Sequence, residues 1–78
     1  MESLPHGQKA RVLLYLVRFG SITQLEALQE FGVMRLASVI FRLRKQHLIE
    51  TVSIENTNRF GEPVKHAKYI YHGKKVNT

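Results

Sequence analysis

The hydrophobic pattern of this chain changes its period once, and that change limits the folds that the chain can adopt. Up to about His47, apolar residues recur at the three- and four-residue spacing of helices. From Glu50 onward they alternate with polar residues, as they do in half-buried strands. The sequence therefore predicts helices in the first part of the chain and a β-hairpin in the second.

Length and composition limit the size of the core. The chain has 78 residues and no cysteine, so neither a disulfide framework nor a thiolate zinc site can support the fold. No internal repeat or linker interrupts the pattern. We expect a single domain over 1–78 with its core at about 7–72, and frayed ends at 1–5 and 73–78.

Two helical segments open the predicted domain. The segment "GQKARVLLYLVRFG" should form a helix that ends at Gly20, and "SIT" after it should be a short extended link. Thr23 and Glu26 have the spacing of a capping box, which predicts the start of a second helix that ends at Gly32. The residues expected in the core are Ala10, Leu13, Leu16 and Val17 from the first helix and Leu25, Leu28 and Phe31 from the second.

The third helical segment, 34–47, has the most informative pattern. Its expected buried side consists of Leu36, Ala37, Ile40 and Leu43. Its opposite side consists of Arg35, Ser38, Arg42 and Lys45, which supply three cations, one hydroxyl and no acid. The apolar residues Val39 and Phe41 fall on the flanks. A polar outer face is often only a solvated one, but this charge pattern favours contact with a polyanion.

The alternating segments "ETVSIENT" and "KHAKYIYH" are predicted to be the two strands of one hairpin, joined by a turn-rich loop from Asn58 to Pro63. The parity of the second strand places Tyr69 and Tyr71 in the core, whereas Tyr15 falls on the outside of the first helix. Phe60 at the tip could stack on a base or a sugar. An aromatic ring in such a loop more often covers the hairpin, and we expect that structural role.

Charge points to the class of partner. Lys and Arg number 12 against six Asp and Glu, so the net charge is +6 and the isoelectric point is near 10.1, which favours nucleic acid. The longest apolar run, "VLLYLV", is far shorter than the roughly 20 residues of a membrane span. Glu2 also disfavours a secretion signal. We expect no membrane association and a cytoplasmic location.

Catalysis and cofactors are not predicted. The chain offers no carboxylate pair, no nucleophile with an evident base and no glycine-rich phosphate loop after a strand. The histidines lack the paired spacing of a zinc helix, so we predict no metal site. We expect surface or phosphate-facing positions for His6, His47, His66 and His72.

Three helices followed by a hairpin predict a winged helix-turn-helix, an α+β fold that is mainly helical. In that architecture the third helix enters the major groove of DNA and the hairpin, the wing at 58–66, lies on the backbone or in the minor groove. The candidate DNA-binding residues of the helix are Arg35, Ser38, Val39, Arg42, Lys45 and Gln46. Those of the wing are Arg59, Lys65, His66 and Lys68.

Four stretches also resemble a known family. They are "GSITQLEALQEFGV" from Gly20, "RLASVIFRLRK" from Arg35, "NRFGEPV" from Asn58 and "AKY" from Ala67. Together they are similar to the small winged helix-turn-helix domains encoded by phages and prophages. The resemblance implies the winged fold, and it suggests DNA binding on the nucleoid of a bacterial host cell. Gly32 lies one position later than the common helix-turn-helix pattern requires, so we expect a longer or differently shaped turn.

Two functions from different classes remain open. The first is a DNA-binding protein that regulates phage transcription or assists recombination. The second is a small phage protein that uses the winged scaffold to inhibit a host protein, with Val39 and Phe41 as its anchors. A homodimer formed through the wing or the first helix is also open, and it would require half-sites about one DNA turn apart.

Overall fold

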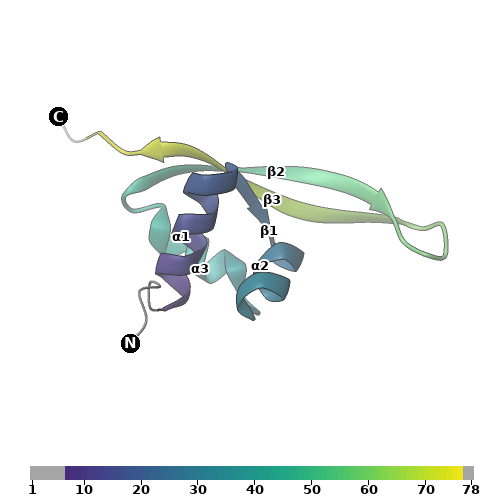
Figure 1. Ribbon diagram of the computed structural model, residues 1–78. Helices are drawn as coiled ribbons and strands as arrows, with labels where there is room; N and C mark the ends of the chain where they lie inside the picture. Colours follow the sequence, from purple (N-terminus) through teal and green to yellow (C-terminus); the bar gives the residue numbers. More distant parts are fainter. Residues whose placement is uncertain (1–6, 77–78) are drawn as a thin grey trace.

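The computed structural model describes residues 7–76, in which three helices pack against one side of a three-stranded sheet (Figure 1). The elements in chain order are α1 (Gln8–Phe19), β1 (Ser21–Thr23), α2 (Gln24–Phe31), α3 (Leu36–Leu43), β2 (His47–Thr57) and β3 (Pro63–Lys74). This order confirms the expected α+β class, with helices first and a hairpin last. The predicted fraying at 1–5 and at 77–78 lies outside the described residues.

Local signals place the helix boundaries. Gly20 and Gly32 adopt left-handed conformations, with φ of 86° and 68°, and end α1 and α2 as predicted. The Thr23 hydroxyl accepts a hydrogen bond from the Glu26 N–H at 3.2 Å, and the Glu26 carboxylate accepts one from the Thr23 N–H at 2.9 Å. These reciprocal bonds confirm the capping box at the start of α2.

The sheet contains one strand more than the sequence indicated. Its order is β1-β3-β2, and all neighbours are antiparallel. The segment "SIT", expected to be only a link, pairs with β3 from Ser21 opposite Ile70 to Thr23 opposite Lys68. The Tyr71 N–H also donates to the Gly20 carbonyl at 2.8 Å, which joins the end of α1 to the central strand.

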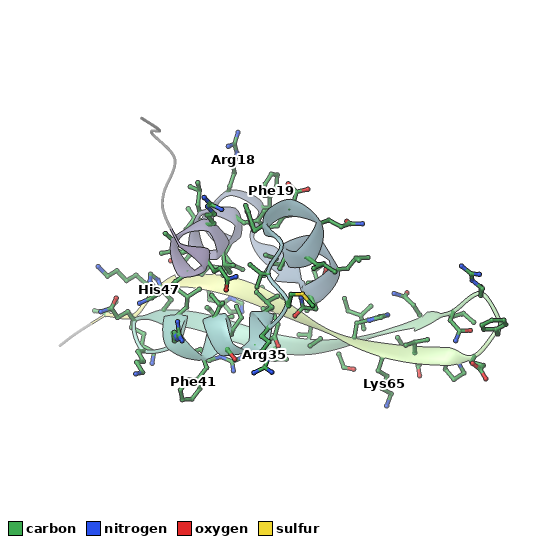
Figure 2. The ribbon with its side chains drawn as sticks, turned by 90° about the horizontal axis from the view of Figure 1, so that it is seen from below. Arg18, Phe19, Arg35, Phe41, His47 and Lys65 are labelled. Carbon is green, nitrogen blue, oxygen red and sulfur yellow. The ribbon has the colours of Figure 1, made fainter. Side chains whose placement is uncertain are left out.

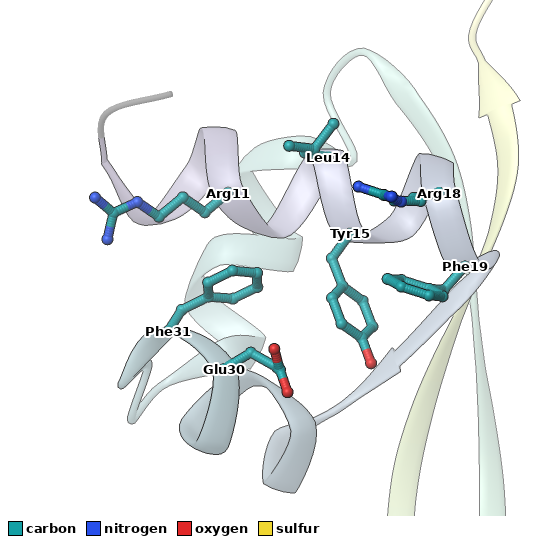
Figure 3. A pocket seen from close by; sticks show the side chains of 7 residues that line it. All are labelled: Arg11, Leu14, Tyr15, Arg18, Phe19, Glu30 and Phe31. Atoms are coloured by element: carbon teal, nitrogen blue, oxygen red, sulfur yellow. The ribbon is translucent and has the colours of Figure 1, made fainter. Parts of the chain in front are cut away.

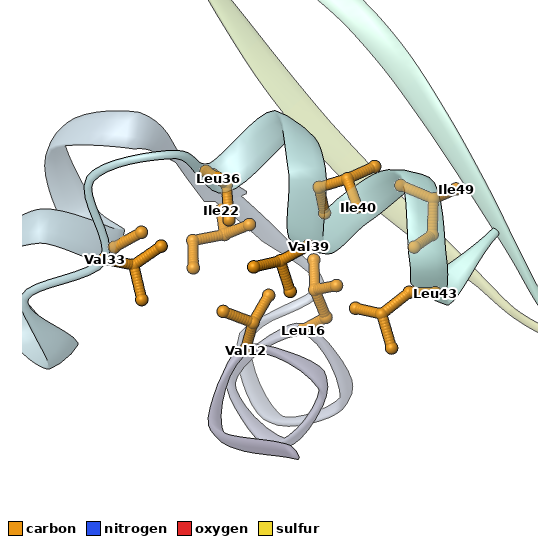
Figure 4. Packing of buried hydrophobic residues seen from close by; sticks show 10 residues of the cluster. Val12, Leu16, Ile22, Val33, Leu36, Val39, Ile40, Leu43 and Ile49 are labelled. Carbon is orange, nitrogen blue, oxygen red and sulfur yellow. The ribbon is translucent and has the colours of Figure 1, made fainter. Parts of the chain in front are cut away.

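The hydrophobic core lies between the helices and the inner side of the sheet (Figure 4). It consists of Val12, Leu16, Ile22, Ala27, Val33, Leu36, Val39, Ile40, Leu43 and Ile49. Tyr69 and Tyr71 pack against this cluster, which confirms the inward parity predicted for the second hairpin strand. Because the cluster takes residues from α3 and from β2, and Tyr69 and Tyr71 of β3 pack against it, it fixes α3 relative to the hairpin.

The burial predicted for the first two helices needs correction. In α1 the buried residues are Val12 and Leu16, whereas Val17 is 59% exposed. In α2 only Ala27 is buried, and both Leu25 and Leu28 are exposed. Leu16 is buried as predicted, and Leu13 and Phe31 pack against the core, but the predictions for Val17, Leu25 and Leu28 are wrong. Helical spacing indicates that a face exists but does not tell how much of it a neighbouring element covers.

The third helix is shorter than expected, and the side of it that is buried differs from the predicted one. It ends at Leu43, and His47 is the first residue of β2 and not part of the helix. Ala37 is exposed and Val39 is buried, the reverse of the expected positions. At the C-terminal end of β3, where fraying was expected from 73, the strand continues to Lys74 and the Lys75 N–H donates to the Gln46 carbonyl at 2.8 Å.

Candidate nucleic-acid interface

The turn between α2 and α3 is held by one side chain. The Gln24 Nε2 atom donates to the Val33 carbonyl at 2.7 Å, and the Gln24 Oε1 atom accepts from the Leu36 N–H at 2.9 Å. Arg35, at the N-cap position of α3, makes no side-chain cap bond. Gln24 therefore satisfies a free amide at the start of α3 and sets where that helix begins. Sequence reasoning missed this role, because residues that meet across a turn leave no periodic signal.

The outward face of α3 is polar and cationic around one aromatic ring. Arg35, Ser38 and Arg42 are exposed, as predicted, and α3 contains no acidic residue. Phe41 is 69% exposed on this face and lies nearer its centre than the flank position expected for it. Within residues 7–76, the side chains of Arg35 and Arg42 form no hydrogen bond or ion pair. The face can therefore offer its cations to an anionic ligand.

Val39 does not belong to this face. Its side chain is 4% exposed and packs in the core beside Leu16, so its assignment as a DNA contact is withdrawn, and so is its role as a protein anchor. The reason is the orientation of α3 about its axis, which differs from the predicted one and places Val39 inside and Ala37 outside.

The turn after α3 carries the last two candidates from this part of the chain. Lys45 and Gln46 are both exposed there, beyond the end of the helix. Arg44 between the helix and these residues has a different role, since its Nε atom donates to the Ile49 carbonyl at 3.1 Å and its guanidinium also bonds the Thr51 hydroxyl. Arg44 thus ties the end of α3 to β2, and Lys45 remains available outside.

The hairpin carries the wing candidates away from the core. The far parts of β2 and β3 extend beyond the helices as a two-stranded ribbon (Figure 1). Arg59, Lys65 and His66 are exposed on it, whereas Lys68 is half-buried near its base. Phe60 at the tip is 78% exposed, so the expectation that its ring covers the hairpin is wrong.

Side chains of α3 and of the wing share one side of the molecule. Arg35, Phe41 and Lys65 project from the same side, and Arg18 and Phe19 of α1 project from the opposite one (Figure 2). The structure therefore brings together candidates that lie far apart in the sequence. One surface, made of the outward face of α3 and the wing, could meet a long anionic ligand.

The histidines separate into different environments. His47, expected at the surface, is buried, and its Nδ1 atom lies 3.0 Å from the Tyr71 hydroxyl. Burial lowers the pKa of His47 below its ordinary value, and the positive charges of Lys74 and Lys9 lower it further. His66 is exposed as expected, His72 is exposed and lies 2.8 Å from a Glu50 carboxylate oxygen, and His6 lies outside the described residues.

A groove lies on the side of the molecule away from the outward face of α3 (Figure 2). Tyr15, Phe19 and Phe31 line this groove of about 530 Å³ between α1 and α2 (Figure 3). The Tyr15 ring lies 4.6 Å from Phe19 and 5.9 Å from Phe31, measured between centroids. Burial raises the pKa of the Tyr15 hydroxyl, and the carboxylates of Glu26 and Glu30 raise it further. Tyr15 thus belongs to this groove and not to the cationic surface.

Residues 7–76 contain neither a membrane-spanning helix nor a cluster of metal ligands. No helix there is long and apolar enough to cross a membrane. The same residues contain no group of three or more histidine, aspartate or glutamate side chains arranged to hold a metal ion.

Comparison with known proteins agrees with the geometry. No curated protein is significantly similar to the chain. A family described as the winged helix-turn-helix domain matches residues 7–71, which spans α1 and nearly all of the hairpin. The match suggests DNA binding. Because it covers most of the chain, this protein belongs to the winged helix-turn-helix domain family.

Proposed function

We propose that this protein binds double-stranded DNA, with α3 in the major groove and the wing on the backbone or in the adjacent minor groove. The observation that carries the proposal is the outward face of α3, where exposed Arg35 and Arg42 flank Ser38 and no acid interrupts them. The projection of Lys65 on the same side and the net charge of +6 add support.

The roles of these side chains follow from their positions. Arg35 and Ser38 lie at and near the start of α3 and are proposed to contact base edges, because the first residues of a recognition helix reach deepest into the groove. Arg42, Lys45 and Gln46 follow later and are proposed to contact phosphates.

The wing is proposed to bind next to the helix. Arg59 has a planar guanidinium at the tip, which suits a narrow, electronegative minor groove. Lys65, His66 and Lys68 are proposed to contact the backbone, with Lys68 reaching it through the end of its half-buried side chain. We expect Arg59→Ala to weaken binding most where A·T-rich sequence flanks the site, and Lys68→Ala to weaken it without changing that preference.

Selection from random DNA at two salt concentrations tests the proposal. Enrichment of a motif, with affinity that falls steeply as salt rises, is the expected result. Arg35→Ala should cost about 1–3 kcal/mol on the selected motif and little on random DNA, whereas Lys45→Ala should weaken both alike. Arg18→Ala is the matched control, because it removes a cation from the opposite side. Absence of salt-dependent DNA binding by the wild-type protein contradicts the proposal.

The biological context is proposed on narrower grounds. We propose a regulator of transcription or an accessory factor in recombination, encoded by a phage or prophage and acting on the DNA of a bacterial cell. The phage context rests on the resemblance of the "NRFG" wing and its companion stretches. A selected motif with two half-sites about one DNA turn apart would indicate a dimer, and a single half-site would indicate a monomer.

A second candidate function is favoured by the groove between α1 and α2. Phe19 is 63% exposed there, and Arg11 and Arg18 line the same groove with one acid, Glu30. Apolar rings next to the Arg18 guanidinium suit an amphipathic helix of a host protein that carries an acid beside its apolar face. This candidate predicts a complex that tolerates salt and is lost in Phe19→Ala, whereas DNA binding should be unaffected by that change.

A further inference from the structure

The tip of the wing is a closed turn built around one side chain. The Asn58 Oδ1 atom accepts hydrogen bonds from the N–H groups of Phe60 and Glu62, at 2.9 and 3.0 Å. The Asn58 N–H donates to the Glu62 carbonyl at 2.9 Å, and the Gly61 N–H donates to the Asn58 carbonyl at 3.0 Å. Gly61 has a φ of 80°, which glycine adopts at little cost. The tip backbone is therefore fixed without any contribution from the Phe60 ring.

Phe60 is presented outward by this turn. Its side chain is 78% exposed, and it makes no ring contact with another aromatic or cationic side chain of residues 7–76. Burial of a phenyl ring is strongly favourable in free energy, yet this ring packs against neither the core nor the turn. A rigid backbone that holds an exposed ring in place lowers the entropy cost of burying that ring in a partner.

The ribbon has the reach to place this ring in a second groove. Packing against the core ends at about Tyr69, which pairs with Thr51. From Thr51 to Thr57 the strand rises about 20 Å at ~3.3 Å per residue, and the tip lies beyond. Half a turn of DNA is about 17 Å, so a ribbon that starts beside a helix in the major groove can reach the neighbouring minor groove.

We propose that Phe60 is an apolar wedge that inserts between base pairs from the minor groove and bends the DNA that α3 holds. This inference rests on the proposed function, since it requires α3 to dock in the major groove. Inserted apolar side chains unstack one base step and kink the duplex by about 20–90°. Arg59, adjacent in sequence, would bind the phosphates or the groove beside the unstacked step. Pyrimidine–purine steps such as TA unstack most readily and should be preferred at the position of the tip.

Energy transfer between dyes on the two ends of a duplex that carries the selected motif tests the wedge. At saturating protein, wild type should shorten the end-to-end distance and Phe60→Ala should leave the duplex straight, with affinity about tenfold lower. Phe60→Leu keeps an apolar wedge and should retain the bend. Phe19→Ala is the matched control, because it removes another exposed phenyl ring from the opposite side of the molecule and should bend DNA as wild type does.

The outcomes separate the two proposals. A wild-type complex with an unbent duplex, or a Phe60→Ala complex as bent as wild type, overturns the wedge and leaves DNA binding intact. A wild-type protein that binds no duplex overturns both. Equal melting temperatures of wild type and Phe60→Ala should accompany the expected result, because the tip is held by backbone and Asn58 bonds that the substitution leaves in place.

Discussion

Gln24→Ala should destabilise the protein through the turn that positions α3. The substitution removes two hydrogen bonds, one to the Val33 carbonyl at 2.7 Å and one from the Leu36 N–H at 2.9 Å. Each such bond contributes about 0.5–1.5 kcal/mol net, so the expected loss is about 2 kcal/mol. In a domain of this size that corresponds to a melting temperature lower by about 8–16 °C.

Thermal unfolding followed by circular dichroism measures this loss against a matched control. Gln29→Ala makes the same chemical change at an exposed position of the same helix, where no side-chain hydrogen bond of Gln29 is formed within residues 7–76, and should melt close to wild type. Gln24→Glu keeps an acceptor for Leu36 but has no proton to donate to Val33 at neutral pH, so it should not restore wild-type stability. If Gln24→Ala and Gln29→Ala melted at the same temperature, the two bonds would not hold the turn.

Three further predictions concern the core, a helix cap and a buried histidine. Ile40→Ala should cost about 2–5 kcal/mol in urea unfolding, because Ile40 is 1% exposed in the core, and an unchanged midpoint would place it elsewhere. Thr23→Ala should cost about 0.5–2 kcal/mol by losing the cap of α2 while Thr23→Ser costs less, and equal stability of all three proteins would argue against the capping box. The pKa of His47 is lower in the folded than in the unfolded state, so the unfolded chain takes up the proton first and stability should be full above pH 6.5 and fall below it. His47→Asn should flatten this fall in unfolding measured from pH 7.5 to 5.5, and an identical pH profile would assign the effect to another group.

The parts of the fold that sequence predicted are those with local causes. Gly20 and Gly32 follow the last apolar residue of a helical pattern and can adopt the left-handed conformation that ends a helix, and a capping box needs only Thr23 and Glu26. These boundaries were therefore predicted correctly. Strand β1 was missed because its hydrogen bonds go to Ile70 and its neighbours, and three residues carry no period of their own. His47 was misplaced for the same reason, since Tyr71 across the sheet decides its environment.

The candidate surface was predicted in composition better than in detail. The outward positions of Arg35, Ser38 and Arg42 follow from helical spacing. The cationic character of the face was also predictable, because that stretch contains no acid whichever side of the helix faces outward. The burial of Val39 and the exposure of Ala37 could not be predicted in this way. Which side chains at the edges of a helical face are buried depends on how much of the helix α1 and the sheet cover. The exposure of Phe60 could not be predicted because it depends on Asn58. The Asn58 side chain closes the turn by hydrogen bonds, so the turn does not need the Phe60 ring for its stability.

The central position of β3 has a consequence for how the chain acquires its structure. The strand that joins β1 to β2 is the last of the three to leave the ribosome, and its pairing of Ile70 with Ser21 closes a loop over most of the described chain. Helices with local contacts form early, whereas contacts of this sequence separation pay their loop-closure entropy late. A nascent chain whose Tyr69 and Ile70 have not yet left the ribosome can form its helices, but it lacks the central strand of the sheet against which the helices pack. Folding of this small protein should therefore be completed only after synthesis of β3.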